Sequence, residues 1–167
     1  MCFELRLCAG LCVVLGTGLH FVFNWLGRPR WLAPLLATNE SVWEHTKLLT
    51  LPVLALVPLQ SRLLGIPAGQ LMGPNLVALA AGGFAMVALY YLWTGAIGGH
   101  SLWLGIGIFL AAVGVCYGVL ASLLPPANPM PGWPAGLAVL AVCHLWFSYR
   151  PPRLPLFRDE VTGRYGL

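Results

Sequence analysis

The sequence predicts an all-α integral membrane protein, a helical bundle with about five transmembrane helices, from three observations. Charged side chains are scarce: nine Lys and Arg with five Asp and Glu make up 8% of 167 residues, against roughly a quarter in an average soluble domain. Hydrophobic residues make up 59%. The few charges also leave long uncharged stretches, and a helix needs about 20 apolar residues to span a bilayer. The lipid bilayer is therefore the expected main partner.

The first two expected helices are separated by a charged loop. The first is the charge-free run 7–27, which ends before a basic Arg-Pro-Arg sequence. The second begins near residues 39–41 and runs to about Leu64. Its start is indicated by Ser41 and Glu44, which have the three-residue spacing of a helix capping box.

The remaining helices must be separated by glycine and proline, because no charged residue lies between Arg62 and Arg150. Connections are expected at 65–74, 95–99 and 125–134. The helices that remain are expected at 75–94, 102–124 and 133–149.

The five helices form one predicted membrane domain, residues 1–150, followed by a C-terminal tail, 151–167, which is expected to fold back over the helix ends. Lys and Arg are enriched on the cytoplasmic side of membrane proteins. Seven of the nine are expected on the side of the tail, and Arg6 and Arg62 on the other. We therefore expect the N-terminus outside and the C-terminus in the cytoplasm, in a bacterial inner membrane. The basic residues are scattered singly, so no nucleic-acid partner is expected.

Unusual polar residues are expected to gather at the cytoplasmic ends of the helices. His20 and Asn24 are four residues apart and therefore share a helix face. Ionisable groups are costly to bury in a membrane, so they commonly mark functional sites. The candidate ligand-binding residues are His20, Asn24, Asn39, Glu40, Glu44, His45, Tyr91 and His144.

A metal site is the first interpretation of these residues. His20, Glu44 and His45 would bind a divalent metal such as zinc, with His144 or Glu40 as a further ligand, because imidazole and carboxylate groups are zinc ligands. Such a site would suit a metal-dependent membrane hydrolase. The spacing contains no H-E-x-x-H motif, so it does not identify a known metal-binding sequence.

Two other interpretations stay open. In a small transporter or channel subunit, a Glu and His pair would titrate during transport. Five helices are few for that task, so a homo-oligomer would supply the missing walls. In a structural scaffold without catalytic activity, Glu44 would complete the capping box with Ser41 and pair with Lys47, and Asn24 would hydrogen-bond a neighbouring helix.

Several short motifs extend along most of the chain. They are His20-x-x-x-Asn24-Trp25, Asn39-Glu-Ser-Val-Trp-Glu-His45, Tyr91-Leu-Trp-Thr-Gly95-Ala-Ile-Gly98, Pro155-Leu-Phe-Arg-Asp159 and Thr162-Gly-Arg-Tyr-Gly166. Together they resemble a family of small bacterial multi-pass membrane proteins known only as a domain of unknown function. The resemblance implies a helical membrane protein from a bacterium and carries no activity with it.

Overall fold

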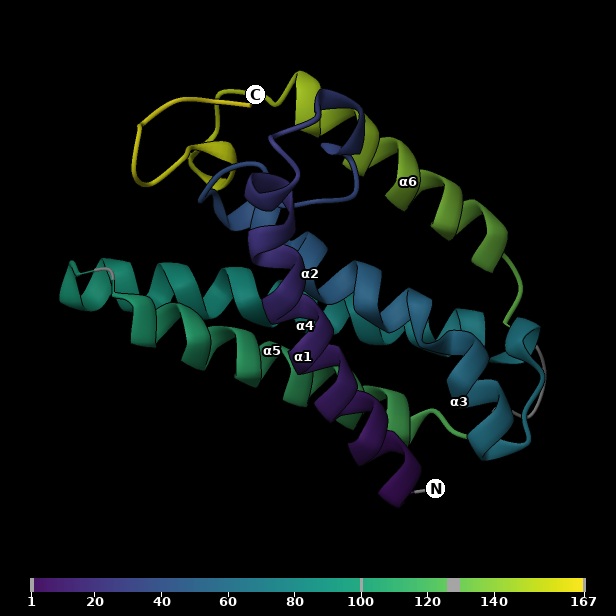
Figure 1. Ribbon diagram of the computed structural model, residues 1–167. Helices are drawn as coiled ribbons and strands as arrows, with labels where there is room; N and C mark the ends of the chain where they lie inside the picture. The colour runs from purple at the N-terminus through teal and green to yellow at the C-terminus, as the bar shows by residue number, and fades with distance from the viewer. Residues whose placement is uncertain (1, 100, 126–129, 167) are drawn as a thin grey trace.

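The computed structural model describes residues 2–99, 101–125 and 130–166. Regular structure in these ranges is helical apart from one isolated bridge between Arg158 and Tyr165, which confirms the all-α prediction. The helices are α1 (Cys2–Trp25), α2 (Val42–Ala55), α3 (Val57–Leu64), α4 (Ala68–Ile97), α5 (Leu102–Ser122) and α6 (Trp133–Tyr149) (Figure 1). Two short 3-10 turns, η1 (Arg30–Leu32) and η2 (Pro155–Phe157), lie in the loop after α1 and in the tail.

Three of these helices, α1, α4 and α5, are long and apolar enough to cross a membrane. The helices α2 and α3 form a fourth candidate span that is bent by 41°. Helix α6 has 17 residues and falls short of the usual span length. The expected count of about five is therefore approximate, since length and composition support three or four.

Parts of the predicted helix layout are wrong. The second predicted helix has its expected ends, at the Ser41 cap and at Leu64, but it is broken at Leu56, two residues before Pro58, which has no N–H to donate to the preceding turn. The predicted connection 65–74 is largely helical, because α4 already begins at Ala68. Its Gly73 marks close packing instead of a turn, since a side chain there would overlap Met130.

Glycines allow the helices to cross closely in the core. A Cβ atom on Gly82 of α4 would lie 2.9 Å from the Ala112 carbonyl oxygen of α5. A Cβ atom on Gly16 of α1 would lie 2.5 Å from the Leu48 carbonyl oxygen of α2. Small residues permit this kind of backbone approach. The crossing at Gly16 lies one turn before His20, so it places that side chain against the start of α2.

The C-terminal tail packs against the end of the bundle that also carries the loop after α1 (Figure 1). Phe157 is buried, with its ring centroid 5.2 Å from that of Trp43 and 5.0 Å from that of Phe147. The Asn39 side-chain amide donates to the Gly166 carbonyl oxygen at 3.3 Å. The tail therefore folds back onto the helix ends, as expected.

Candidate metal centre

Three potential metal ligands meet at the end of the bundle near the tail. His20 comes from α1, Glu40 from the loop before α2, and His45 from the first turns of α2. His20 Nε2 lies 3.7 Å from Glu40 Oε1, and His45 Nε2 lies 3.4 Å from Glu40 Oε2. One ligand-type atom from each residue lies within 4.8 Å of the other two. Zinc ligands lie about 2.0–2.2 Å from the ion, so one ion between the three atoms requires only small side-chain movements.

The ring of His45 is oriented by the backbone of its own helix. Its Nδ1 lies 2.8 Å from the Ser41 carbonyl oxygen. A carbonyl only accepts hydrogen bonds, so Nδ1 carries the hydrogen and donates it. Nε2 then faces Glu40 either with a second proton or with a lone pair that requires a cation between the two groups. Metal-binding histidines are commonly held in this way, through the nitrogen that does not bind the metal.

The ring of His20 does not have the anchor that the ring of His45 has. Its Nδ1 is buried and has no hydrogen-bond partner among the described residues. Buried polar atoms are normally paired, so this nitrogen lacks an expected partner. Its ring centroid lies 5.5 Å from that of His45, and both rings therefore face the same small volume.

Glu40 supplies the negative charge of this group. Its pKa lies below the ordinary value, chiefly because His45 hydrogen-bonds to it and also because both imidazoles favour its charged form. The carboxylate is therefore ionised at neutral pH. Two imidazoles and one carboxylate form a donor set that is typical of zinc.

A polar chamber of about 330 Å³ opens beside two of these residues, His20 and Glu40. The residues that line it include His20, Asn24, Arg28, Glu40, Asp159 and Thr162. On another side, Glu40 and His45 border a small apolar recess of about 50 Å³ together with Met86 and Ile108. The candidate centre thus lies between a polar space and an apolar one.

Asp159 brings a second carboxylate to the chamber from the tail. Burial acts to raise its pKa, but hydrogen bonds from the Thr162 hydroxyl at 2.6 Å and from the Val161 amide at 2.9 Å outweigh this. The pKa of Asp159 therefore lies below its ordinary value, and the group is charged. Most of its acceptor capacity is already used within the tail.

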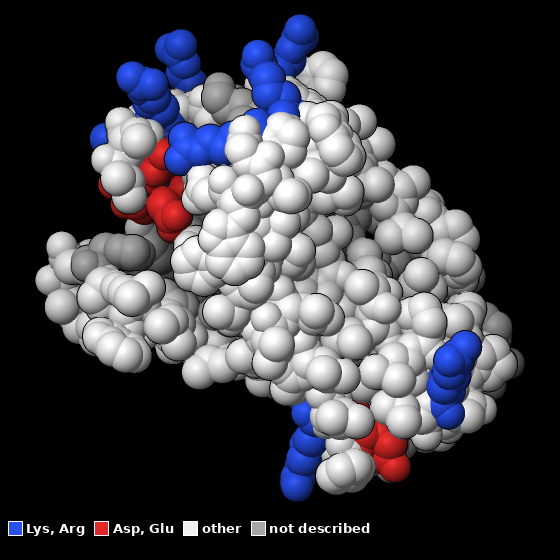
Figure 2. All heavy atoms as spheres, viewed as in Figure 1, with Lys and Arg blue, Asp and Glu red and all other residues white. Residues whose placement is uncertain are grey.

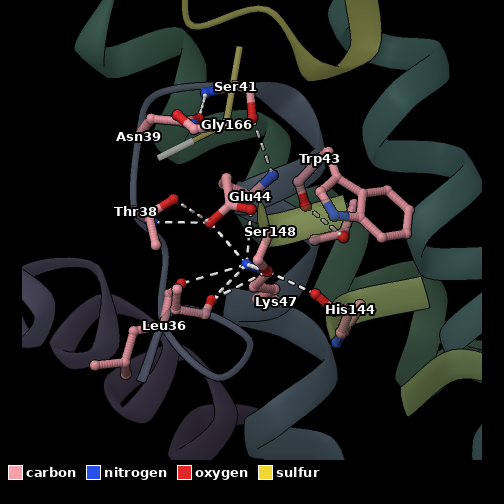
Figure 3. A network of polar contacts seen from close by, with 12 residues as sticks. Leu36, Thr38, Asn39, Ser41, Trp43, Glu44, Lys47, His144, Ser148 and Gly166 are labelled. Atoms are coloured by element: carbon pink, nitrogen blue, oxygen red, sulfur yellow. Dashed lines mark hydrogen bonds and ion pairs between the residues drawn. The ribbon is translucent and has the colours of Figure 1, made fainter. Parts of the chain in front are cut away.

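Glu44 lies outside this centre, in a separate buried network (Figure 3). Its carboxylate oxygens lie 2.6 and 2.7 Å from Lys47 Nζ, and the Thr38 amide and hydroxyl donate to it at 2.8 and 2.9 Å. Its own backbone N–H donates to the Ser41 hydroxyl at 3.3 Å, which forms the expected N-terminal cap. Contrary to expectation, the structure therefore does not bring Glu44 together with the two histidines, because Lys47 and Thr38 bind its carboxylate. Glu40 takes that place.

The other sequence candidates lie in three environments. Asn24 and Asn39 line the chamber with His20 and Glu40. Tyr91 is exposed on α4. His144 is buried on α6, with its ring 5.5 Å from that of Trp43, and it lines neither the chamber nor the apolar recess.

Sequence reasoning did not include Arg28, Asp159 or Thr162 in the site. Arg28 continues the four-residue spacing of His20 and Asn24, and this spacing was the available signal for it. The two tail residues reach the chamber only because the tail folds back, which no local pattern indicates.

Comparisons with known proteins agree with the motif resemblance. The model of a family described as "Family of unknown function (DUF6512)" matches residues 5–167. No match was found among curated proteins or among solved structures. Function must therefore be inferred from the geometry of the site.

Proposed function

The chain belongs to this family of unknown function, which supplies no activity, and we propose from the site itself that it is an integral membrane protein that binds a divalent metal, preferably zinc, through His20, Glu40 and His45. The observation that carries the proposal is the convergence of three ligand atoms within 4.8 Å, with His45 Nδ1 anchored on a backbone carbonyl. Both features are typical of protein zinc sites.

Membrane insertion is supported by the distribution of charge. Three helices, or four with the bent pair, are long and apolar enough to span a bilayer. Figure 2 shows Lys and Arg at two ends of the molecule, with a broad uncharged region between them. In a membrane, that region would contact lipid and the metal centre would lie near the more basic end.

Three protein ligands leave a fourth zinc position open. The adjoining chamber lies where water or a substrate would reach that position. Hydrolytic zinc enzymes use such an arrangement, because the metal lowers the pKa of its bound water and polarises the bond to be cleaved. Metal-dependent hydrolysis is therefore the reaction class that this geometry favours.

Transport of the metal is less well supported. Below the centre, the helices are packed with apolar side chains that include the buried Cys12, Leu49, Cys116 and Leu120. Ion pathways across membranes are lined by polar or charged groups. This packing favours a resident metal over a transported one.

Metal analysis of the purified protein tests the proposal. We expect about one zinc ion per chain in the wild type, as for a single three-ligand site. Glu40→Gln and His45→Gln should each weaken zinc binding by about 100-fold or more, since even the loss of a residue that supports a ligand costs 10–100-fold. Competition with a chromogenic chelator measures these affinities.

The matched control is His144→Gln, which removes a buried histidine outside the centre. It should keep the wild-type zinc content. Equal zinc affinity in the wild type, Glu40→Gln and His45→Gln would contradict the proposal. Thermal unfolding of each variant in detergent shows whether the bundle is intact.

A further inference from the structure

We propose that the polar chamber beside the metal centre binds a phosphate group, held between the metal and the guanidinium of Arg28. This inference rests on the metal site proposed above. Arg28 lines the same chamber of about 330 Å³ as the metal ligands His20 and Glu40. One anion in that space would therefore have a guanidinium and an open metal position as neighbours.

Arg28 is placed at the chamber by an unusual backbone conformation. Its φ is +58°, and it is the only non-glycine residue with positive φ in the described ranges. The preceding Gly27 is also left-handed, at +77°. The Arg28 amide donates to the Phe23 carbonyl oxygen at 2.9 Å, which closes a tight turn at the end of α1. Uncommon conformations of this kind cluster at functional sites.

The side chain of Arg28 is held in place while part of it stays available. Its Nε donates to the Asn24 side-chain oxygen at 2.8 Å. Its two terminal amino groups make no hydrogen bond within the described part of the chain, and the residue is exposed. A guanidinium matches the geometry of phosphate oxygens better than an ammonium does. The anchored group is therefore suited to one side of a phosphate.

The charges around the chamber make phosphate binding depend on the metal. Without a metal, the carboxylates of Glu40 and Asp159 face a single guanidinium, and an anion is repelled. A bound divalent ion is the largest local charge and reverses this balance. By reciprocity, phosphate should then strengthen metal binding by the same factor by which the metal strengthens phosphate binding.

Two sources of phosphate fit the surroundings. A soluble phosphate compound would enter from the aqueous end of the bundle. A phospholipid would place its headgroup in the chamber and keep its acyl chains in the surrounding bilayer, because the apolar recess of about 50 Å³ beside Glu40 and His45 is too small for them. The phosphate chemistry is the same in both cases.

Equilibrium dialysis of zinc-loaded protein in detergent with radiolabelled inorganic phosphate tests the inference. Arg28→Gln should weaken phosphate binding by about 10-fold or more, because it removes hydrogen bonds to a charged group. Its zinc content and unfolding temperature should remain those of the wild type. The control Arg30→Gln removes another exposed charge from the same loop, outside the chamber lining, and should leave phosphate binding unchanged.

The ligand series identifies the source. Glycerol 3-phosphate and phosphatidic acid in mixed micelles are compared with inorganic phosphate, and diacylglycerol serves as the lipid without phosphate. Tighter binding of phosphatidic acid supports a lipid source, and equal binding of all three phosphates supports a soluble one. Removal of zinc by a chelator should weaken each of them by about 10-fold or more.

Phosphate binding that is equal in Arg28→Gln and Arg30→Gln, or equal with and without zinc, overturns the inference. So does zinc-loaded protein that binds none of the phosphates, and in each case the metal site still stands. Absence of zinc is detected by metal analysis before any phosphate is added. That result removes the proposed function, and this inference with it.

Discussion

At the scale of single residues, Lys47 is a full charge that water does not reach. Its side chain is 0% exposed, and its ammonium donates to Glu44, to the Ala33 carbonyl oxygen at 2.8 Å and to the Ser148 hydroxyl at 2.8 Å (Figure 3). Burial of an ion costs several kcal/mol, which only good partners offset. These partners come from the loop after α1, from α2 and from α6, so one ammonium ties three segments together.

Removal of this charge should destabilise the bundle. In Lys47→Met the Glu44 carboxylate remains buried without its counter-charge, and the loss of one partner from a buried pair costs about 3–5 kcal/mol. We expect a lower midpoint of thermal unfolding in detergent. The double variant Glu44→Gln/Lys47→Met removes both charges and should recover much of the loss. Equal stability of Lys47→Met and the wild type would show that the network contributes nothing.

The same residues show what sequence can decide at this scale. The Glu44–Lys47 pair was foreseeable because a three-residue spacing places both groups on one helix face. The choice between Glu40 and Glu44 as metal ligand was not foreseeable, since both lie near the start of α2 and the approach of His20 from the remote helix α1 decides which carboxylate it faces. Thr38 and Lys47 engage Glu44, which leaves Glu40 to face the histidines.

At the scale of elements, the candidate centre depends on how closely α1 approaches α2. The two helices are in close contact at Gly16, where an added Cβ atom would meet the Leu48 carbonyl oxygen at 2.5 Å and the Phe109 ring at 2.6 Å. A carbonyl oxygen in a helix cannot move aside without moving the helix. Any side chain at this position should therefore push α1, and His20 with it, away from α2.

Gly16→Ala should accordingly weaken zinc binding by about 10-fold or more, the scale seen when a ligand loses its support. Overpacking should also lower stability by about 1–3 kcal/mol. The control is Gly18→Ala on the same helix, where an added Cβ atom meets nothing within 4 Å. It should match or exceed the stability of the wild type, because alanine favours helix. If both variants bind zinc like the wild type, the position of α1 does not control the site.

The ends of helices were predictable only where a glycine or proline does end the helix. The last helix was expected at 133–149, and α6 spans those residues. Gly73 and Pro74 were expected in a connection, but they lie inside α4. The sequence alone does not distinguish a glycine that ends a helix from one that admits a neighbour such as Met130, because the neighbour is remote in sequence.

At the scale of the whole molecule, the basic residues mark two ends of the bundle (Figure 2). Exposed arginines in the loop after α1 and in the tail share one end, where the Tyr149 hydroxyl donates to the Arg30 carbonyl oxygen. Arg6 and Arg62 lie on α1 and α3 toward the other end. The positive-inside rule then predicts that the tail and the chamber face the cytoplasm.

Thiol labelling from either side of the membrane tests this orientation. The N- and C-termini lie at opposite ends of the bundle (Figure 1), and Cys2 is exposed whereas Cys8, Cys12 and Cys116 are buried. All variants carry Cys143→Ser, because the thiol of Cys143 on α6 is partly exposed. In right-side-out spheroplasts, an impermeant maleimide should label this background and leave the same protein with Cys2→Ser unlabelled. Cys2→Ser/Arg153→Cys should be labelled only in inside-out vesicles. The reverse pattern would invert the orientation. Labelling of both sites from one side would mean that an even number of segments crosses the membrane. The short α6 would then be the first candidate for a helix that does not cross.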